Sequence, residues 1–346
     1  MTEGASDLAE RLAMARQAWP SAMSDGDIVE AAKTGLSIAA AHLQPASDQA
    51  RTTLWNGYFK YLYGKKASYQ FQDFEIADYN LTAAGKLGLL RGPKLSAGTL
   101  ESGDYICMIG AAQFFGRFAQ TSLQEMIAQR FGLPVLNLSF GGAGPQSFLN
   151  DEAARLLRKA KLVVVQVMAG RSVGCDEYPG GMSTYRKGTR IAVNREVLLL
   201  EIAQQDPEEY ARLARKWLGL YVDAYARIGA QTEGRSILVW VSKRRPKDWS
   251  IRSGAAENTL GVYPQMVTAK ALRAIRSHFT AYVDCTEPKK PIGFVSRFDG
   301  QPCPFVATDG TLQRSTWYYP SPEFHRSAFE TIVPAMEKLL PRSARP

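Results

Sequence analysis

The sequence lacks the marks of several large classes of protein. Its longest apolar run, LVVVQVMAG at residues 162–170, is much shorter than the roughly 18 to 20 residues that a membrane-spanning helix requires. The opening stretch, residues 1–17, mixes acidic and basic residues and has neither the basic nor the apolar region of a secretory signal. These two absences predict a soluble cytoplasmic protein with no membrane span.

Cysteine is scarce, and the few cysteines stand far apart. Cys107, Cys175, Cys285 and Cys303 form no CxxC pair, which excludes the common zinc sites and a dense disulfide framework. This usage favours a reducing cytoplasm. A P-loop is absent too, so we predict neither a metal nor a cofactor.

Acidic residues are outnumbered by basic ones. Lys and Arg total 42 against 33 Asp and Glu, for a net charge of +9, which favours anionic partners. The densest basic stretch, SKRRPKDW at residues 242–249, is either a solvated loop or a site for a phosphate, sulfate or acidic sugar. No nucleic-acid-binding motif accompanies it. The predicted partner is therefore an anionic small molecule or oligosaccharide and not a nucleic acid.

The chain changes character near residue 95. Apolar residues at spacings of three and four predict helices up to about residue 65, and the polar, Gly- and Pro-punctuated stretch that follows indicates an extended linker. We predict a helical N-terminal extension and linker at residues 1–95 and an α/β domain at residues 96–346. The aromatic face of the extension packs either on this domain or on a second copy in a homo-oligomer. It comprises Trp55, Tyr58, Phe59 and Tyr61.

Beyond this boundary, strand and helix patterns alternate. Five short apolar runs predict buried strands, and amphipathic stretches between them predict helices. Continuous apolar strands with intervening helices indicate a parallel sheet covered on both faces. We therefore predict a three-layer α/β/α sandwich with a mostly parallel, flavodoxin-like sheet. The strand candidates are residues 105–110, 134–140, 161–170, 236–241 and 281–287.

Helix signals are clearest in the second half of the chain. Asp206 as N-cap, Pro207 at the first helical position and Gly229 as a stop predict one long helix. A shorter helix is predicted near residues 263–278, and the last helix opens at Pro322. Because ligands of open parallel sheets bind at the carboxyl ends of the strands, the loops after the strands and the final segment hold the candidate site.

These loops occur in an order that resembles the SGNH (GDSL-like) hydrolase superfamily over residues 105–340. The resemblance implies a nucleophilic serine after the first strand, but Gly110 is followed there by Ala111 and Ala112, which carry no hydroxyl. It implies an oxyanion glycine at Gly141 or Gly142. The segments GAAQFFGRF, LNLSFGGAGP and VVVQVMAGRS are also similar to an uncharacterised bacterial group with the same sheet pattern.

The later blocks of the superfamily match unevenly. Its third block, Gly-x-Asn-Asp, corresponds to residues 170–173, so the asparagine donor is absent and Arg171 stands nearby. Its last block has Asp three residues before the histidine. Here Pro322 occupies that position, and Glu323 lies two residues before His325.

His325 is the candidate general base, one of only three histidines in the chain. Its ordinary pKa lies near 6.5, and the positive end of a helix dipole favours the neutral imidazole that accepts a proton. Glu323 or Asp309 is the predicted carboxylate that orients the ring. A structural role for His325 is the alternative. If His325 is the base, the attacking group is Ser139, Ser172, a water or the hydroxyl of an acceptor.

Several further residues are candidates for substrate binding. The backbone amides of Gly141, Gly142 and Gly144 can approach an oxyanion closely, or they form a tight turn under a packed helix. Arg117 and Arg171 can clamp a carboxylate, sulfate or phosphate, unless they pair with acids such as Asp176 or Glu177. The remaining candidates are Gly110, Ala112, Ser172 and Gln113, whose amide can orient a sugar hydroxyl or cap the backbone.

These observations predict an enzyme that hydrolyses or transfers an acyl or similar group on a saccharide or polysaccharide, with His325 as base. A non-catalytic protein that kept the sheet and lost the serine is one alternative. The other is an anion-dependent sulfo- or phosphotransferase of polysaccharide biosynthesis that uses the basic loops.

Overall fold

The structure is a computed structural model, and it describes residues 76–78, 89–116, 119, 121–181, 183–189, 191–248, 260–287, 292–293, 305–306, 312–316 and 319–340. The helices predicted within residues 1–65 lie outside this part. The chain divides into two compact units. The first comprises Met1–Lys94, Gly116–Ser122 and Lys290–His325, and the second comprises Leu95–Phe115, Leu123–Lys289 and Arg326–Pro346.

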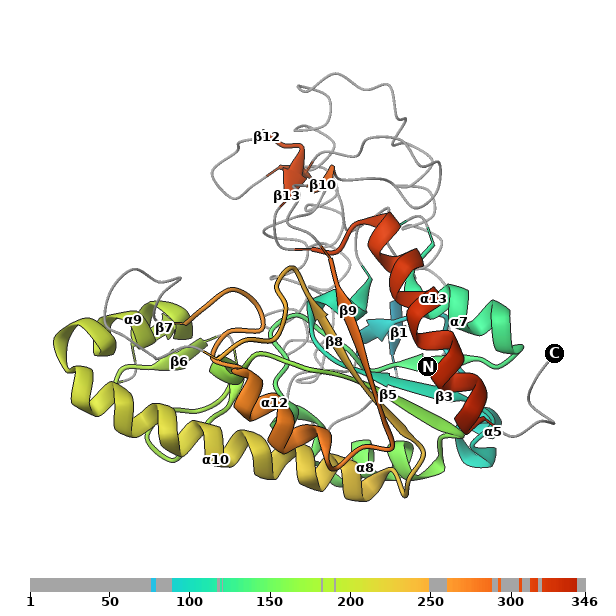
Figure 1. The fold of residues 1–346 in the computed structure, drawn as a ribbon, viewed down its shortest axis with the longest axis horizontal. Helices are drawn as coiled ribbons and strands as arrows, with labels where there is room; N and C mark the ends of the chain where they lie inside the picture. The colour runs from blue at the N-terminus through green and yellow to red at the C-terminus, as the bar shows by residue number, and fades with distance from the viewer. Residues whose placement is uncertain are drawn as a thin grey trace, which may run out of the picture. The chain divides into compact units, whose positions relative to one another are not determined.

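The second unit is built on a five-stranded parallel sheet (Figure 1). Its strand order, β4-β3-β5-β8-β9, corresponds to the flavodoxin-like order 2-1-3-4-5. All four neighbouring pairs run parallel, and all five predicted strands are confirmed. The strands are β3 (Ile106–Ile109), β4 (Val135–Asn137), β5 (Leu162–Gln166), β8 (Ser236–Ser242) and β9 (Ala281–Thr286).

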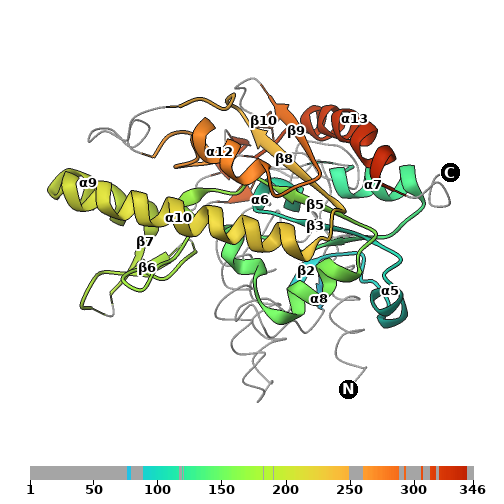
Figure 2. The same ribbon diagram turned by 60° about the horizontal axis from the view of Figure 1, so that its bottom comes forward.

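Helices cover both faces of this sheet, as predicted (Figures 1 and 2). On one face, α10 (Pro207–Gln231) contacts α8 (Asp151–Lys159) and α12 (Ala269–Arg276). On the other, α7 (Leu123–Phe131) is joined to α13 (Pro322–Leu339) by an ion pair of 2.5 Å between Arg130 and Glu337. Every residue of β3, β5 and β8 is buried, which explains why their sequences are mostly apolar.

Smaller elements complete the second unit. A hairpin of β6 (Ser183–Tyr185) and β7 (Ala192–Asn194) leads into α9 (Arg195–Gln205), and neither was predicted. Two 3₁₀ turns, η3 (Pro145–Phe148) and η4 (Gly170–Ser172), follow β4 and β5. The short helices are α5 (Ala97–Ser102) and α6 (Ala112–Phe115).

The described part of the first unit contains three antiparallel strand pairs. One of them, β1 (Ile76–Asp78) with β2 (Leu89–Arg91), lies in the segment predicted to be an extended linker. Three paired residues per strand are too few to produce a visible period in the sequence. The other strands are β10 (Ile292–Gly293), β11 (Phe305–Val306), β12 (Leu312–Gln313) and β13 (Ser315–Thr316).

Helix α10 begins where the sequence predicted and ends later. The Asp206 side chain accepts the N–H of Glu209 at 2.9 Å, and Pro207 is the first helical residue. The predicted stop at Gly229 is wrong, because the helix continues to Gln231. Gly229 is instead a packing position, since a Cβ there would lie 3.0 Å from the Cβ of His278 and would clash with its carbonyl oxygen. The helix predicted near residues 263–278 is shorter, at Ala269–Arg276.

No helix in the described ranges is both long and apolar enough to span a membrane.

Two glycines of α10 provide a matched test of this packing. We expect Gly229→Ala to lower the free energy of unfolding by roughly 1–3 kcal/mol, because the new methyl group meets a backbone carbonyl. Gly219→Ala is the control, since nothing lies within 4 Å of a Cβ at that position. It should raise the free energy of unfolding by up to about 1 kcal/mol, because alanine favours the helix. Urea unfolding measures the change in the free energy of unfolding of each variant. Equal changes in the two variants would contradict the packing role of Gly229.

Candidate functional site

The carboxyl ends of β3, β4 and β5 form one continuous edge in the second unit. The parallel ladder between β3 and β4 extends past the strands, because the Leu138 and Phe140 amides donate to carbonyl oxygens of Met108 and Gly110 at 2.9 and 3.3 Å. Gly110 has no room for a side chain. A Cβ there would lie 2.8 Å from the Cβ of Gln166, the last residue of β5. Glycine is therefore required at position 110 because any side chain there would clash with Gln166.

Gln166 connects three segments at this edge. Its Oε1 accepts the Ala111 N–H at 2.8 Å, and its Nε2 donates to the Gln113 Oε1 at 3.2 Å and to the Tyr263 hydroxyl at 2.7 Å. A backbone N–H can only donate, so the side of Gln166 that faces Ala111 must be the oxygen. This assignment settles the orientation of both amides, which X-ray density alone would leave ambiguous.

The Gln113 amide group is left with unused donors. Its oxygen is taken by Gln166, while its Nε2 is enclosed and makes no hydrogen bond, and the residue is 4% exposed. A buried polar group without a partner costs about 1–3 kcal/mol. Gln113 therefore presents two N–H groups, in a defined direction, at the start of α6.

Ser139 is a second enclosed polar residue on this edge. It is fully buried, and its Oγ has no hydrogen-bond partner. Its backbone N–H donates to the Asn137 Oδ1 at 3.0 Å, and the Asn137 amide donates to the Phe114 carbonyl oxygen in α6 at 3.0 Å. The loop after β4 is thereby tied to the helix that carries Gln113.

The three predicted glycines of the next loop differ in their surroundings. Gly141 is exposed, with nothing within 4 Å of a Cβ. Gly142 has a φ of 82°, a left-handed conformation that favours glycine. Gly144 is buried, and a Cβ there would lie 2.8 Å from the Cβ of Ser172. Glycine at 144 thus brings the loop after β4 against the loop after β5.

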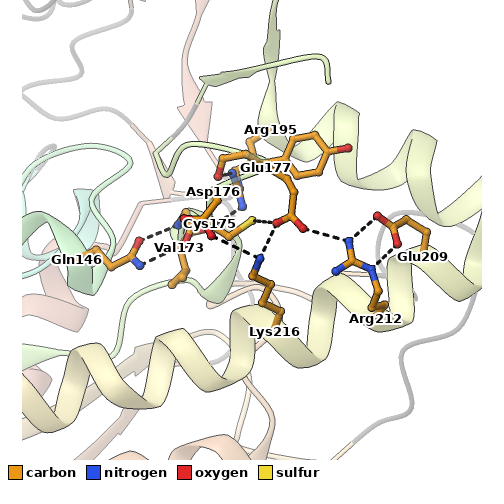
Figure 3. A network of polar contacts seen from close by, with 11 residues as sticks. Gln146, Val173, Cys175, Asp176, Glu177, Arg195, Glu209, Arg212 and Lys216 are labelled. Atoms are coloured by element: carbon orange, nitrogen blue, oxygen red, sulfur yellow. Dashed lines mark hydrogen bonds and ion pairs between the residues drawn. The ribbon is translucent and has the colours of Figure 1, made fainter. Parts of the chain in front are cut away.

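Arg171 and Ser172 lie in η4, directly beyond β5. Arg171 is 8% exposed, and its one ion pair joins its Nε to the Glu196 carboxylate at 3.6 Å. Asp176 and Glu177, the acids that the sequence offered as partners, contact Lys216 and Arg212 instead (Figure 3). Ser172 is buried.

Arg195 holds the loop that follows η4. Its Nη1 donates to carbonyl oxygens of Pro179 and Tyr178 at 2.6 and 3.3 Å, and its Nη2 donates to that of Val173 at 2.5 Å. Its guanidinium also lies 5.1 Å from the centre of the Trp217 ring. Burial lowers the pKa of Arg195 to about 10, which leaves it charged at neutral pH.

The basic stretch after β8 has a structural role through Arg244. Its guanidinium donates to carbonyl oxygens of Val262, Pro264 and Val267 at 2.7 to 2.8 Å. These bonds hold the segment that carries Tyr263, the partner of Gln166. Arg244 is therefore neither part of a solvated loop nor directed at an anion.

The remaining predicted residues belong to the first unit or lie outside the described part. His325 is 2% exposed and lies in the first turn of α13, where its backbone N–H donates to the Ser321 carbonyl oxygen at 3.0 Å. Gly116 lies beside its ring, because a Cβ there would be 3.7 Å from the His325 Cε1. Glu323 is exposed and, two residues away on a helix, points to another side. Arg117 and Asp309 are outside the described residues.

The structure thus brings Gly110, Gln113, Ser139, Gly144 and Ser172 to one edge of the second unit, with Ala112, Gly141, Gly142 and Arg171 in the same loops. Gln166, Tyr263 and Asn137 are additions that the sequence analysis missed. The signal for Gln166 was present, because it is a polar residue in the middle of the apolar run LVVVQV. In the described part of the chain, no three His, Cys, Asp or Glu side chains are arranged to hold a metal ion.

Comparisons with known proteins give little beyond this geometry. Residues 71–178, less than half of the chain, match a family described as "Domain of unknown function (DUF6473)". No curated protein matches the chain in sequence.

Two solved structures of family 2 carbohydrate esterases are similar to the chain. The enzyme with a carbohydrate-binding domain from Corynascus thermopiles (Myceliophthora fergusii) is 11% identical over 73% of this chain and 69% of that one, with a TM-score of 0.34. The enzyme from Clostridium thermocellum, in complex with cellohexaose, is 12% identical over 72% of this chain and 66% of that one, with a TM-score of 0.31. At these identities and TM-scores neither likeness carries information about function.

The cluster of charges beside η4 allows a test of its electrostatics. The hydrogen bond from Lys216 lowers the pKa of Glu177 to about 2, from an ordinary value of 4.5. Glu177 should therefore stabilise the fold fully above about pH 4.5, and this contribution should disappear as the pH falls towards 2. We expect the stability difference between the native protein and Glu177→Gln to shrink across that window in urea unfolding. In a Lys216→Met background the dependence on pH should become weaker but persist, because the Cys175 thiol still donates to Glu177, and an unchanged slope there would refute the pairing.

Proposed function

We propose that the carboxyl edge of the second unit binds a carbohydrate ester, and that the protein hydrolyses this ester or transfers its acyl group. The observation that carries the proposal is the Gln113 amide, which is oriented by Gln166 and has two N–H groups without a partner. Buried donors without a partner favour a ligand whose oxygen accepts their hydrogen bonds, because a ligand that lacks this oxygen leaves the donors unpaired and binds more weakly.

The chemistry of this edge suits a neutral, oxygen-rich ligand. A carboxamide donates without carrying charge, and the Ser139 hydroxyl can donate or accept. A carbohydrate ester offers a carbonyl oxygen for the first group and hydroxyls for the second. The backbone N–H groups of Gly141 and Gly142 are further donors that the loop after β4 can provide.

The proposed reaction needs no covalent serine intermediate, since Ala111 and Ala112 have no hydroxyl. A water or an acceptor hydroxyl attacks the acyl carbon after a general base removes its proton. Negative charge then develops on the carbonyl oxygen, where the Gln113 amide stabilises it. The acyl carbon–oxygen bond breaks, and the proton returns from the base to the departing sugar hydroxyl. His325 is the base that the sequence predicts.

A second candidate function is carbohydrate binding without catalysis. It is favoured by the alanines at the nucleophile position and by the full burial of the Ser139 side chain. Both functions require the same donor from Gln113, and they differ in whether a bond is broken.

Kinetics with an ester separate the two functions. We expect the native protein to hydrolyse p-nitrophenyl acetate and an acetylated oligosaccharide. Gln113→Leu should lower kcat by about 100-fold, because one donor to the developing oxyanion is lost, and His325→Ala should abolish turnover. Lys187→Gln, at an exposed position of the turn between β6 and β7, serves as the control and should leave the rate unchanged.

The isosteric variant Gln113→Glu tests the direction of the hydrogen bond. It keeps an oxygen for Gln166 but replaces the two unpartnered N–H groups by an acceptor, so that activity at neutral pH should fall as far as in Gln113→Leu. Lack of turnover by the native protein, together with thermal stabilisation by the oligosaccharide that Gln113→Leu loses, would establish the binding function. Neither turnover nor stabilisation would refute the proposal.

A further inference from the structure

Arg171 is a buried cation that makes no hydrogen bond to the described residues. Its side chain is 9% exposed, and its single ionic contact, 3.6 Å from Nε to Glu196, is longer than a hydrogen bond. The Nε is enclosed and unpartnered. A guanidinium has five N–H donors, and none of those of Arg171 is used within the described residues.

Two other arginines of the second unit, the buried Arg195 and the half-buried Arg244, show what a structural arginine looks like in this protein. Arg195 and Arg244 each donate to three backbone carbonyl oxygens, and each lies over a tryptophan ring. Both hold a loop in place through these bonds. Arg171 holds no loop and lies over no ring, although burying its charge without compensation is costly.

The cations near Arg171 are paired with acids of their own, including Arg212 with Glu209 at 2.6 Å. Glu177 is shared between Lys216 and Arg212, and Asp176 lies 3.9 Å from Lys216 (Figure 3). Glu196, at 39% side-chain exposure, is the only acid in contact with Arg171 in the described part of the chain. The Arg195 cation also acts on this region, since the charges of Arg171 and Arg195 disfavour each other. Arg171 differs from these cations because its only acid lies beyond hydrogen-bond distance, so a negatively charged ligand would compensate its buried charge.

The Arg171 loop is held on two sides, which fixes the position of its backbone. The Gly170 N–H donates to the Gln265 carbonyl oxygen at 2.8 Å, and Ser172 packs against Gly144. Arg171 follows β5, whose last residue is Gln166, and Gln166 orients the Gln113 amide. The charged and the neutral donors therefore belong to the same strand edge.

We propose that Arg171 binds a singly charged oxyanion of the substrate, a carboxylate or a sulfate ester, so that the substrate is an acidic carbohydrate. The proposal rests on the proposed function, because it adds a charged subsite to that edge. One guanidinium matches one negative charge, and its planar fork fits two oxygens of such a group. This subsite would also make use of the basic character of the chain.

Binding measurements on the full chain test the proposal. The probes are trigalacturonate, its methyl ester as the uncharged counterpart, and galactose 6-sulfate with galactose for the sulfate. We expect at least one acidic probe to bind about tenfold more tightly than its neutral partner in isothermal titration calorimetry. Arg171→Leu should remove this preference and leave affinity for the neutral probe unchanged. Which acidic probe responds identifies the oxyanion.

Glu196→Gln should change the affinity for the acidic probe in the opposite direction from Arg171→Leu. This second test holds even if Arg171→Leu fails to fold. It removes the carboxylate that competes for Arg171, so the acidic probe should bind several-fold more tightly. If Arg171 served only to pair with Glu196, this variant would lower the melting temperature without changing the preference. Lys187→Gln, at an exposed position, is the control for a general loss of positive charge and should leave the preference unaltered.

The outcomes separate this inference from the proposed function. Equal affinity for acidic and neutral probes, or an acidic preference that survives in Arg171→Leu, overturns the role of Arg171. In either case, binding of the neutral probe that depends on Gln113 leaves the proposed function standing. Absence of binding by every carbohydrate probe overturns both.

Discussion

One side-chain amide organises the candidate site. Gln166 lies at the end of a completely buried strand, where an unpaired polar group would be costly. Its oxygen and nitrogen are satisfied by three segments, from the loop after β3, from α6 and from the segment that follows β8. Its bulk also requires that Gly110 have no side chain. The orientation of Gln113, and with it the proposed chemistry, follows from these contacts.

The basic character of the chain has more than one physical origin. Arg195 and Arg244 act as internal clamps whose charge is balanced by carbonyl dipoles, and burial lowers the pKa of each to about 10. Lys216 and Arg212 are engaged by Glu177. Arg171 is different, because its buried guanidinium makes no hydrogen bond to the described residues and lies 3.6 Å from its acid, Glu196. A net charge counted from composition cannot separate a structural arginine from one that is available to a ligand.

The elements with repetitive signals were predictable. The five strands of the main sheet are continuous apolar runs, and α10 begins with an N-cap and a proline. The exceptions have local physical causes. Gly229 resembles a helix stop but is present because α10 packs closely on His278, while the three-residue pairing of β1 with β2 is too short to give a period. The α9 pattern escaped notice because a hairpin of three-residue strands precedes it.

The sequence alone determined the parallel sheet and its functional edge, since apolar runs that alternate with helices bury both faces and bring the strand ends together. It also pointed to Gly110, Gln113 and Arg171 as residues of that edge. Only the tertiary structure decided what each of them does. The bonds of Gln166 join residues 53 to 97 positions apart, and the acids nearest to Arg171 in the sequence pair with cations of α10. Hydrogen bonds and charges depend on neighbours in space, and no local pattern encodes those neighbours.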